Sequence, residues 1–112
     1  MTIDAPEVEE VETTRIAFPA QTDLGLREMT IGDALREAAE RWPDRLAVSE
    51  VTVAGDTARR WTYAELLCDA TRLARALASR FQKGERVVVW APNIPEWALM
   101  EYACALSGGV LV

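Results

Sequence analysis

The side chains that could do chemistry in this 112-residue sequence are carboxylates, arginines and two cysteines, because the chain contains no histidine. The absence of histidine excludes a Ser-His-Asp triad, a Cys-His pair and a histidine-ligated metal within these residues. Its 18 acidic residues show no pairing in an apolar setting of the kind that prepares a carboxyl group for catalysis. We therefore identify no catalytic, cofactor-binding or metal-binding residue from the sequence, and we expect these residues alone to be inactive.

Residues 90–97, WAPNIPEW, read as a strand-to-helix turn of the kind that often binds nucleotides. The apolar run 86–91 before it does not alternate, which predicts a strand buried on both faces. A nearly all-apolar, buried helix is expected over about 95–107, with Asn93 as its candidate cap, Pro95 in its first turn and Glu96 at the positive end of its dipole. The turn at 92–95 contains no glycine, so it matches neither G-x-G-x-x-G nor the phosphate-binding loop, and a dinucleotide-binding half-domain is disfavoured.

Cys68 and Cys104 lie far apart and form no CxxC motif. The start of the chain does not resemble a secretory signal, so we expect both thiols to be reduced and buried in a cytoplasmic protein. No transmembrane segment is expected either, because Glu96 and Glu101 interrupt the best apolar run before it reaches about 18 residues.

The net charge of −6 is unevenly spread, since residues 1–12 hold five acids and no base. We interpret residues 1–29 as an acidic leader and irregular lead-in, which would be either solvated or a docking segment. The rest of the chain is nearly neutral and carries no basic stripe, so nucleic-acid binding is not expected.

A helix is predicted from the N-cap Thr30 to the residue before Pro43, with Asp33 in its first turn. Its predicted apolar stripe consists of Ile31, Ala34, Leu35, Ala38 and Trp42. Ion pairs between residues four apart are expected on its solvent-exposed face, Arg36 with Glu40 and Glu37 with Arg41. The segment 45–62 then predicts a β-hairpin around the turn AGDT.

A second helix is predicted to follow the capping box of Thr62 and Glu65. Its predicted core stripe consists of Tyr63, Leu66, Leu67, Ala70, Leu73, Ala74, Leu77 and Phe81. Gly84 suits the left-handed position beyond the helix end. Gly108 and Gly109 are expected to stop the apolar helix, and VLV at 110–112 to begin another strand.

The predicted fold class is therefore α/β: a helix, a β-hairpin, a helix and then a truncated β-α-β unit. A strand buried on both faces needs sheet neighbours and covering helices that these residues do not supply. We expect residues 30–112 to be the incomplete N-terminal part of a larger domain.

Three stretches in order resemble the AMP-forming acyl-CoA synthetases of the adenylate-forming superfamily. TIGDALREAAERWPDRLAV (30–48) resembles their opening helix and strand, and WTYAEL (61–66) matches their first core motif, L-[ST]-Y-x-E-L, with Trp61 in place of leucine. KGERVVVWAPNIPEWALMEYACALSGGVLV (83–112) is similar to the following segment and enters the second core motif. The resemblance covers about residues 30–112.

The resemblance implies an ATP-dependent ligase that converts a carboxylic acid, with a fatty acid as the expectation, to an acyl-adenylate and then to a coenzyme A thioester. ATP, Mg²⁺ and coenzyme A are implied for the full-length protein, but the family motifs that hold them lie beyond residue 112. No catalytic or ATP-binding residue is carried onto this chain. The resemblance implies a scaffold in which Tyr63 and Glu65 support packing and capping, while Asn93 and Glu96 shape the turn.

Two alternatives stay open from the sequence. One is an adenylation-domain fragment that loads a carrier protein instead of coenzyme A. The other is a stand-alone, non-enzymatic interaction module that binds a partner through the apolar helix 95–107 and an exposed strand edge.

Overall fold

The protein is described by a computed structural model that covers residue 25 and residues 27–112. Its elements are α1 (Ile31–Arg41), β1 (Leu46–Val51), β2 (Thr57–Thr62), α2 (Tyr63–Ala78), β3 (Arg86–Val87), α3 (Glu96–Ser107) and β4 (Val110–Leu111). This order confirms the predicted α/β arrangement of helix, hairpin, helix and β-α-β unit. The predicted acidic leader, residues 1–12, lies outside the described residues.

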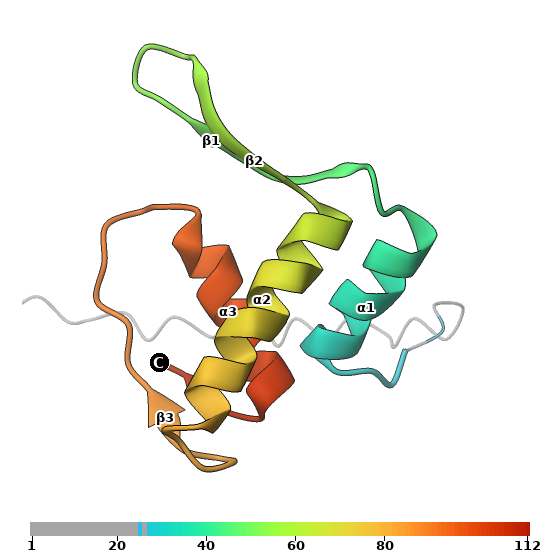
Figure 1. Cartoon of the computed structure of the whole chain (residues 1–112), viewed down its shortest axis with the longest axis vertical. Coiled ribbons are helices and arrows are strands. Elements are labelled where there is room, and N and C mark those ends of the chain that lie inside the picture. Colours follow the sequence, from blue (N-terminus) through green and yellow to red (C-terminus); the bar gives the residue numbers. More distant parts are fainter. Residues whose placement is uncertain (1–24, 26) are drawn as a thin grey trace, which may run out of the picture.

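Helix α2 is the centre of the described fold, since it contacts α1, α3 and both strands of the hairpin (Figure 1). Its N-terminal half places Leu66 and Ala70 in a buried cluster with Leu35 of α1. Its C-terminal half joins a second buried cluster with β3 and α3, which consists of Ala74, Leu77, Val87, Ala103 and Cys104. Both buried clusters therefore include residues of α2, and the other elements pack against this helix.

Both α1 and α2 begin with a capping box. The Thr62 hydroxyl accepts a hydrogen bond from the Glu65 backbone N–H at 3.3 Å, and the Glu65 carboxylate accepts one from the Thr62 backbone N–H at 2.8 Å. Thr30 and Asp33 make the same exchange at the start of α1. Each box satisfies backbone N–H groups that the first helical turn leaves without partners, so both helices start at the residues predicted from sequence.

The buried face of α1 differs from the predicted stripe. Gly32, Leu35 and Ala39 are buried, whereas Ile31 is 54% exposed. The reason is a close approach to α3: a Cβ atom on Gly32 would lie 3.0 Å from Cδ2 of Leu106. Because glycine has no side chain, α1 and α3 meet at this position. Of the predicted stripe, Leu35 is buried and Ala38 half-buried, whereas the other members are exposed: Ile31, Ala34 and Trp42.

The predicted ion pairs of α1 are also replaced by others. Arg36 binds Asp33 at 2.9 Å, and Glu37 binds Arg27, which precedes the helix. The pair of Arg36 with Asp33 is an i, i+3 contact, which helix geometry allows as readily as the predicted i, i+4 contact with Glu40.

The predicted stripe of α2 is confirmed from Tyr63 to Leu77, whose members are all buried or half-buried. Phe81 is an exception at 40% exposure, because the helix ends at Ala78, one turn before it. Gly84 has the predicted left-handed backbone, with φ of 87°.

The β-α-β unit forms as predicted, with β3 and β4 parallel and paired Arg86 to Val110 and Val87 to Leu111. Gly108, with φ of 79°, ends α3 in the left-handed conformation that glycine adopts without steric cost.

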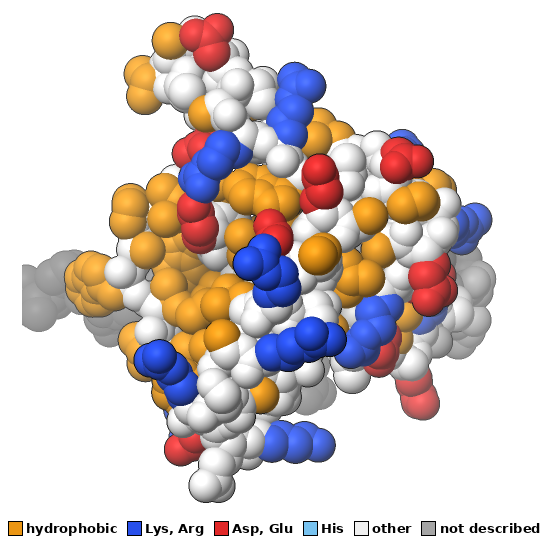
Figure 2. All heavy atoms as spheres, in the orientation of Figure 1, with side chains coloured by type: hydrophobic (Ala, Val, Ile, Leu, Met, Phe, Trp, Pro, Cys, Tyr) orange, Lys and Arg blue, Asp and Glu red, His pale blue; other side chains and the backbone are white. Residues whose placement is uncertain are grey.

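The expectation of a strand buried on both faces is wrong for the described chain. Val87 packs against α2 and α3, but Val88 is 72% and Trp90 99% exposed. Successive strand residues point to opposite faces, and no described element covers the face beyond Val88. Helix α3 is likewise only partly buried, at Ala103 and Cys104. Figure 2 shows hydrophobic side chains gathered on the face between the hairpin and β3.

Candidate functional site

The carboxyl end of β3 is the natural place to look for a site, because ligands of parallel α/β sheets bind beyond that end of the strands. Backbone pairing continues there past the assigned strands: the Val112 N–H donates to the Val87 carbonyl at 3.0 Å, and the Val89 N–H to the Val112 carbonyl at 3.1 Å. Residues 88–95 then lead to α3. They contain no ionisable side chain, so the polar groups of this loop are its backbone, the Asn93 amide and the Trp90 indole N–H.

The turn into α3 is closed by backbone and indole groups. Pro95 is the N-cap residue, and no side chain caps the helix, so the predicted cap by Asn93 is wrong. The Trp97 N–H instead donates to the Ile94 carbonyl at 3.1 Å, and the Trp97 indole Nε1 donates to the Pro92 carbonyl at 3.0 Å. Pro95 already has helical backbone angles, which brings these carbonyls into reach without a polar cap.

Glu96, the first residue of α3, is held by an arginine from the hairpin. Nη1 and Nη2 of Arg59 both reach its carboxylate, Nη2 at 3.1 Å from Oε2. Nε of the same Arg59 donates to Glu50 Oε2 at 2.7 Å. The hydrogen bonds from Arg59, helped by a backbone N–H, hold the pKa of the Glu96 carboxyl below its usual value of 4.5.

We expect the ionised Glu96 carboxylate to stabilise the fold, so that the free energy of unfolding falls when acid protonates it. The folded pKa is lower than the unfolded one, so the contribution is complete above about pH 4.5 and is lost as the pH falls through the folded pKa. The substitution Glu96→Gln should therefore reduce the loss of stability on acidification from pH 7 to pH 3, measured as the urea midpoint at each pH. The matched control is Glu101→Gln, an exposed glutamate on the same helix. Parallel pH profiles for the two variants would contradict the prediction.

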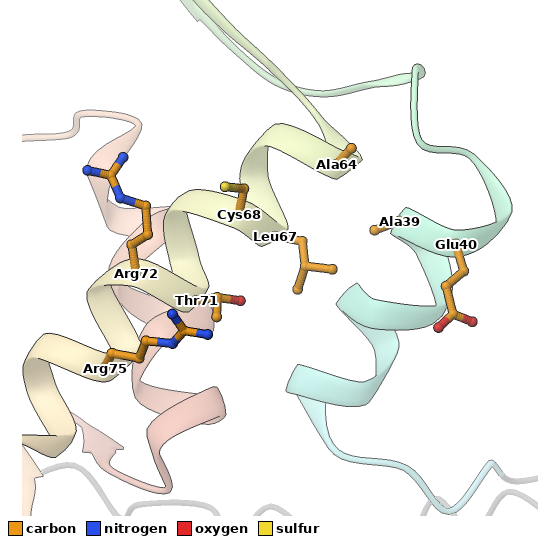
Figure 3. A pocket seen from close by; sticks show the side chains of 8 residues that line it. All are labelled: Ala39, Glu40, Ala64, Leu67, Cys68, Thr71, Arg72 and Arg75. Carbon is orange, nitrogen blue, oxygen red and sulfur yellow. The ribbon is translucent and has the colours of Figure 1, made fainter.

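An open hollow of about 410 Å³ lies between α1 and α2. Its lining consists of Ala39, Glu40, Ala64, Leu67, Cys68, Thr71, Arg72 and Arg75. Figure 3 shows Ala39 and Leu67 facing each other across it, while Arg72 points away from α1. The lining surface is mostly apolar, and Figure 3 shows the carboxylate of Glu40 pointing away from Cys68. This hollow therefore does not pair the thiol with an activating base.

Cys68 is exposed and Cys104 is buried, and both are free thiols. The prediction that both are buried is wrong for Cys68, which lies on the side of α2 opposite the buried Leu66 and Ala70. Burial raises the pKa of the Cys104 thiol and so disfavours its thiolate.

We expect iodoacetamide to modify Cys68 in the native protein and to leave Cys104 unmodified until urea unfolds the chain. Peptide mass spectrometry after timed alkylation measures both rates in one sample. Equal native rates for the two cysteines would contradict the assigned burial.

Within residue 25 and residues 27–112, no three histidine, cysteine or acidic side chains gather as a metal site would require. The same residues include no helix that has both the length and the apolar character needed to cross a membrane. Sequence analysis named no site residue, and it missed the contact of Arg59 with Glu96. The sequence could have predicted only that Arg59 lies opposite Glu50 in the hairpin.

Residues 35–112 match the family described as AMP-binding enzyme, and the chain belongs to this family.

The relatives are acyl-CoA ligases and adenylation domains. The mitochondrial medium-chain acyl-CoA ligase of Danio rerio is 38% identical over 88 residues, which are 78% of this chain and 14% of that ligase. The fatty acyl CoA synthetase of Mycobacterium tuberculosis matches with a TM-score of 0.62 and 34% identity, over 73% of this chain and 16% of that one. An artificially fused adenylation-PCP di-domain NRPS from Klebsiella oxytoca matches with a TM-score of 0.62 and 28% identity, over 74% of this chain and 15% of that one.

These matches confirm the resemblance to acyl-CoA synthetases. The chain spans 14–15% of the length of the first curated relatives it matches.

Proposed function

We propose that residues 30–112 are a scaffold segment of an ATP-dependent acyl-CoA ligase, which converts a carboxylic acid to an acyl-adenylate and then to a coenzyme A thioester. The match of residues 35–112 to the AMP-binding enzyme family carries this proposal. The matched range includes the hairpin, α2 and the whole β-α-β unit, so the agreement extends over an ordered set of elements.

The described residues do not fit ATP, Mg²⁺ or coenzyme A as resident ligands. The turn at 92–95 has no glycine to let backbone N–H groups approach a phosphate, and the described side chains form no group of three His, Cys, Asp or Glu. We therefore assign no step of the reaction to a residue of this chain. The proposed role of these residues is structural: α3 connects β3 and β4, and these paired strands would form part of a larger sheet.

The proposed substrate is a fatty acid. Support comes from relatives whose names specify medium-chain acyl-CoA, long-chain fatty acid or fatty acyl CoA. The test expresses the complete reading frame that contains these residues and supplies ATP, Mg²⁺, coenzyme A and one acid at a time. We expect AMP and acyl-CoA to form with saturated acids of medium or long chain.

Two results would correct this proposal at different levels. Turnover of small aromatic acids alone would overturn the fatty-acid assignment and keep the reaction class. The absence of any carboxylate-dependent AMP formation would overturn the reaction class itself.

A second candidate acceptor is a carrier protein, favoured by the match to the adenylation-PCP di-domain. The same enzyme is assayed with coenzyme A or with a phosphopantetheinylated carrier protein. Acyl transfer to the carrier alone would make this chain part of an adenylation domain, whereas transfer to coenzyme A supports the ligase.

A further inference from the structure

The hairpin and α3 are joined by one arginine. Arg59 of β2 lies directly opposite Glu50 of β1 in the strand register and binds it through Nε. Its two terminal nitrogens both contact the carboxylate of Glu96, which is 37 positions away at the start of α3. One guanidinium therefore makes three charge-assisted contacts to two different elements.

Packing against the helices fixes the base of the hairpin and not its outer part. An isolated two-stranded hairpin is marginally stable in water. At its base, Ala47, Val48 and Trp61 pack against the buried cluster of Leu35 and Leu66. Beyond the base it stands clear of the helices (Figure 1). Among the described residues, the contact between Arg59 and Glu96 is the one ion pair between the hairpin and α3.

The geometry of this contact is more favourable than that of an ordinary surface ion pair. Exposed pairs contribute little unless they are bidentate or part of a network, and this one is both. The guanidinium carbon of Arg59 also lies 5.5 Å from the centroid of the Trp61 ring. Trp61 is itself fixed, because its Nε1 donates to Asp69 of α2 at 3.2 Å.

We propose that Arg59 is a positioning residue that ties the hairpin in one orientation to the first turn of α3, at the end of the loop 88–95. The tie couples two parts of the chain: a change at Glu96 alters the hairpin, and a change at Arg59 alters the start of α3. This inference goes beyond the proposed ligase function and does not depend on the substrate or the acceptor.

Amide hydrogen exchange followed by mass spectrometry tests the coupling in the purified protein. We expect Glu96→Gln, a change in α3, to accelerate exchange in the hairpin, residues 46–62, by about threefold to tenfold. Arg59→Met should do the same and should also accelerate exchange at residues 94–99. The double variant should exchange no faster than Arg59→Met alone, and Arg59→Lys should lie between Arg59→Met and the parent.

The chain supplies matched controls for both changes. Arg60→Met alters the neighbouring arginine, which forms no ion pair with a described residue, and Glu101→Gln alters an exposed glutamate of α3. Hairpin exchange that is the same in Glu96→Gln as in Glu101→Gln would overturn the tie. Equal acceleration throughout α2 would also overturn it, because the variant would then act through global stability.

Discussion

Replacing Leu66 with alanine is expected to lower the free energy of unfolding by about 2–5 kcal/mol. Leu66 is 2% exposed and packs with Leu35 and Ala70 where α1, α2 and the base of the hairpin meet. Truncation removes buried apolar area and leaves a cavity that three elements would have to move together to fill. Urea denaturation of the purified variant and parent measures the difference.

The control for this prediction is Val53→Ala in the hairpin turn, where the side chain is fully exposed at 110%. That variant should be within about 0.5 kcal/mol of the parent. A Leu66→Ala variant as stable as the Val53→Ala variant would show that the cluster around α2 does not hold the fold together.

Enlarging Ala103 to leucine is the substitution with the second largest expected effect. Ala103 is 0% exposed and lies in the cluster that joins α3 to β3 and to the C-terminal half of α2. The added carbons have no space, so α3 must shift away from α2 or side chains must leave their preferred rotamers. Overpacking of this kind costs about 1–3 kcal/mol, which thermal or urea unfolding can resolve.

Ala76→Leu provides the matched control, because it is the same substitution at an exposed position of α2. We expect it to be nearly neutral, since leucine and alanine have similar helix propensities. If Ala103→Leu were equally neutral, the close packing of α3 against α2 and β3 would be wrong.

The parts of the fold that were predicted correctly follow from local chemistry. Thr62 with Glu65 fixes the start of α2, Pro43 prevents α1 from continuing, and Gly108 supplies the left-handed residue that ends α3. Each of these signals acts within four residues, so it can be read without knowing what the element packs against.

The parts that were predicted wrongly depend on which surfaces meet. The face of α1 is chosen by the contact of Gly32 with Leu106, and the exposure of Cys68 by the side of α2 that α1 leaves open. Apolar composition predicted that the strand after Arg86 is buried on both faces, but composition does not say which neighbour covers each face. Val88 and Trp90 are accordingly exposed in the described chain.

The contact of Glu96 with Arg59 could not be predicted from the sequence either, because it too depends on which surfaces meet. Glu96 could be placed at the start of a helix by its neighbours, but its partner Arg59 comes from a hairpin 37 residues earlier. A pairing of such separation follows from the fold and has no local pattern. The absence of histidine and of glycine at 92–95, in contrast, was readable at once and limited the chemistry of these residues.

We propose that residues 30–112 contribute scaffold to an adenylate-forming enzyme and supply none of its reacting groups. The most direct measurement is carboxylate-dependent exchange of labelled pyrophosphate into ATP, which reports adenylate formation. It compares the protein from the complete reading frame with residues 1–112 alone. We predict exchange by the former with a fatty acid and none by the latter. Exchange catalysed by residues 1–112 alone would contradict the scaffold assignment, and no exchange by either protein would contradict the adenylate-forming activity.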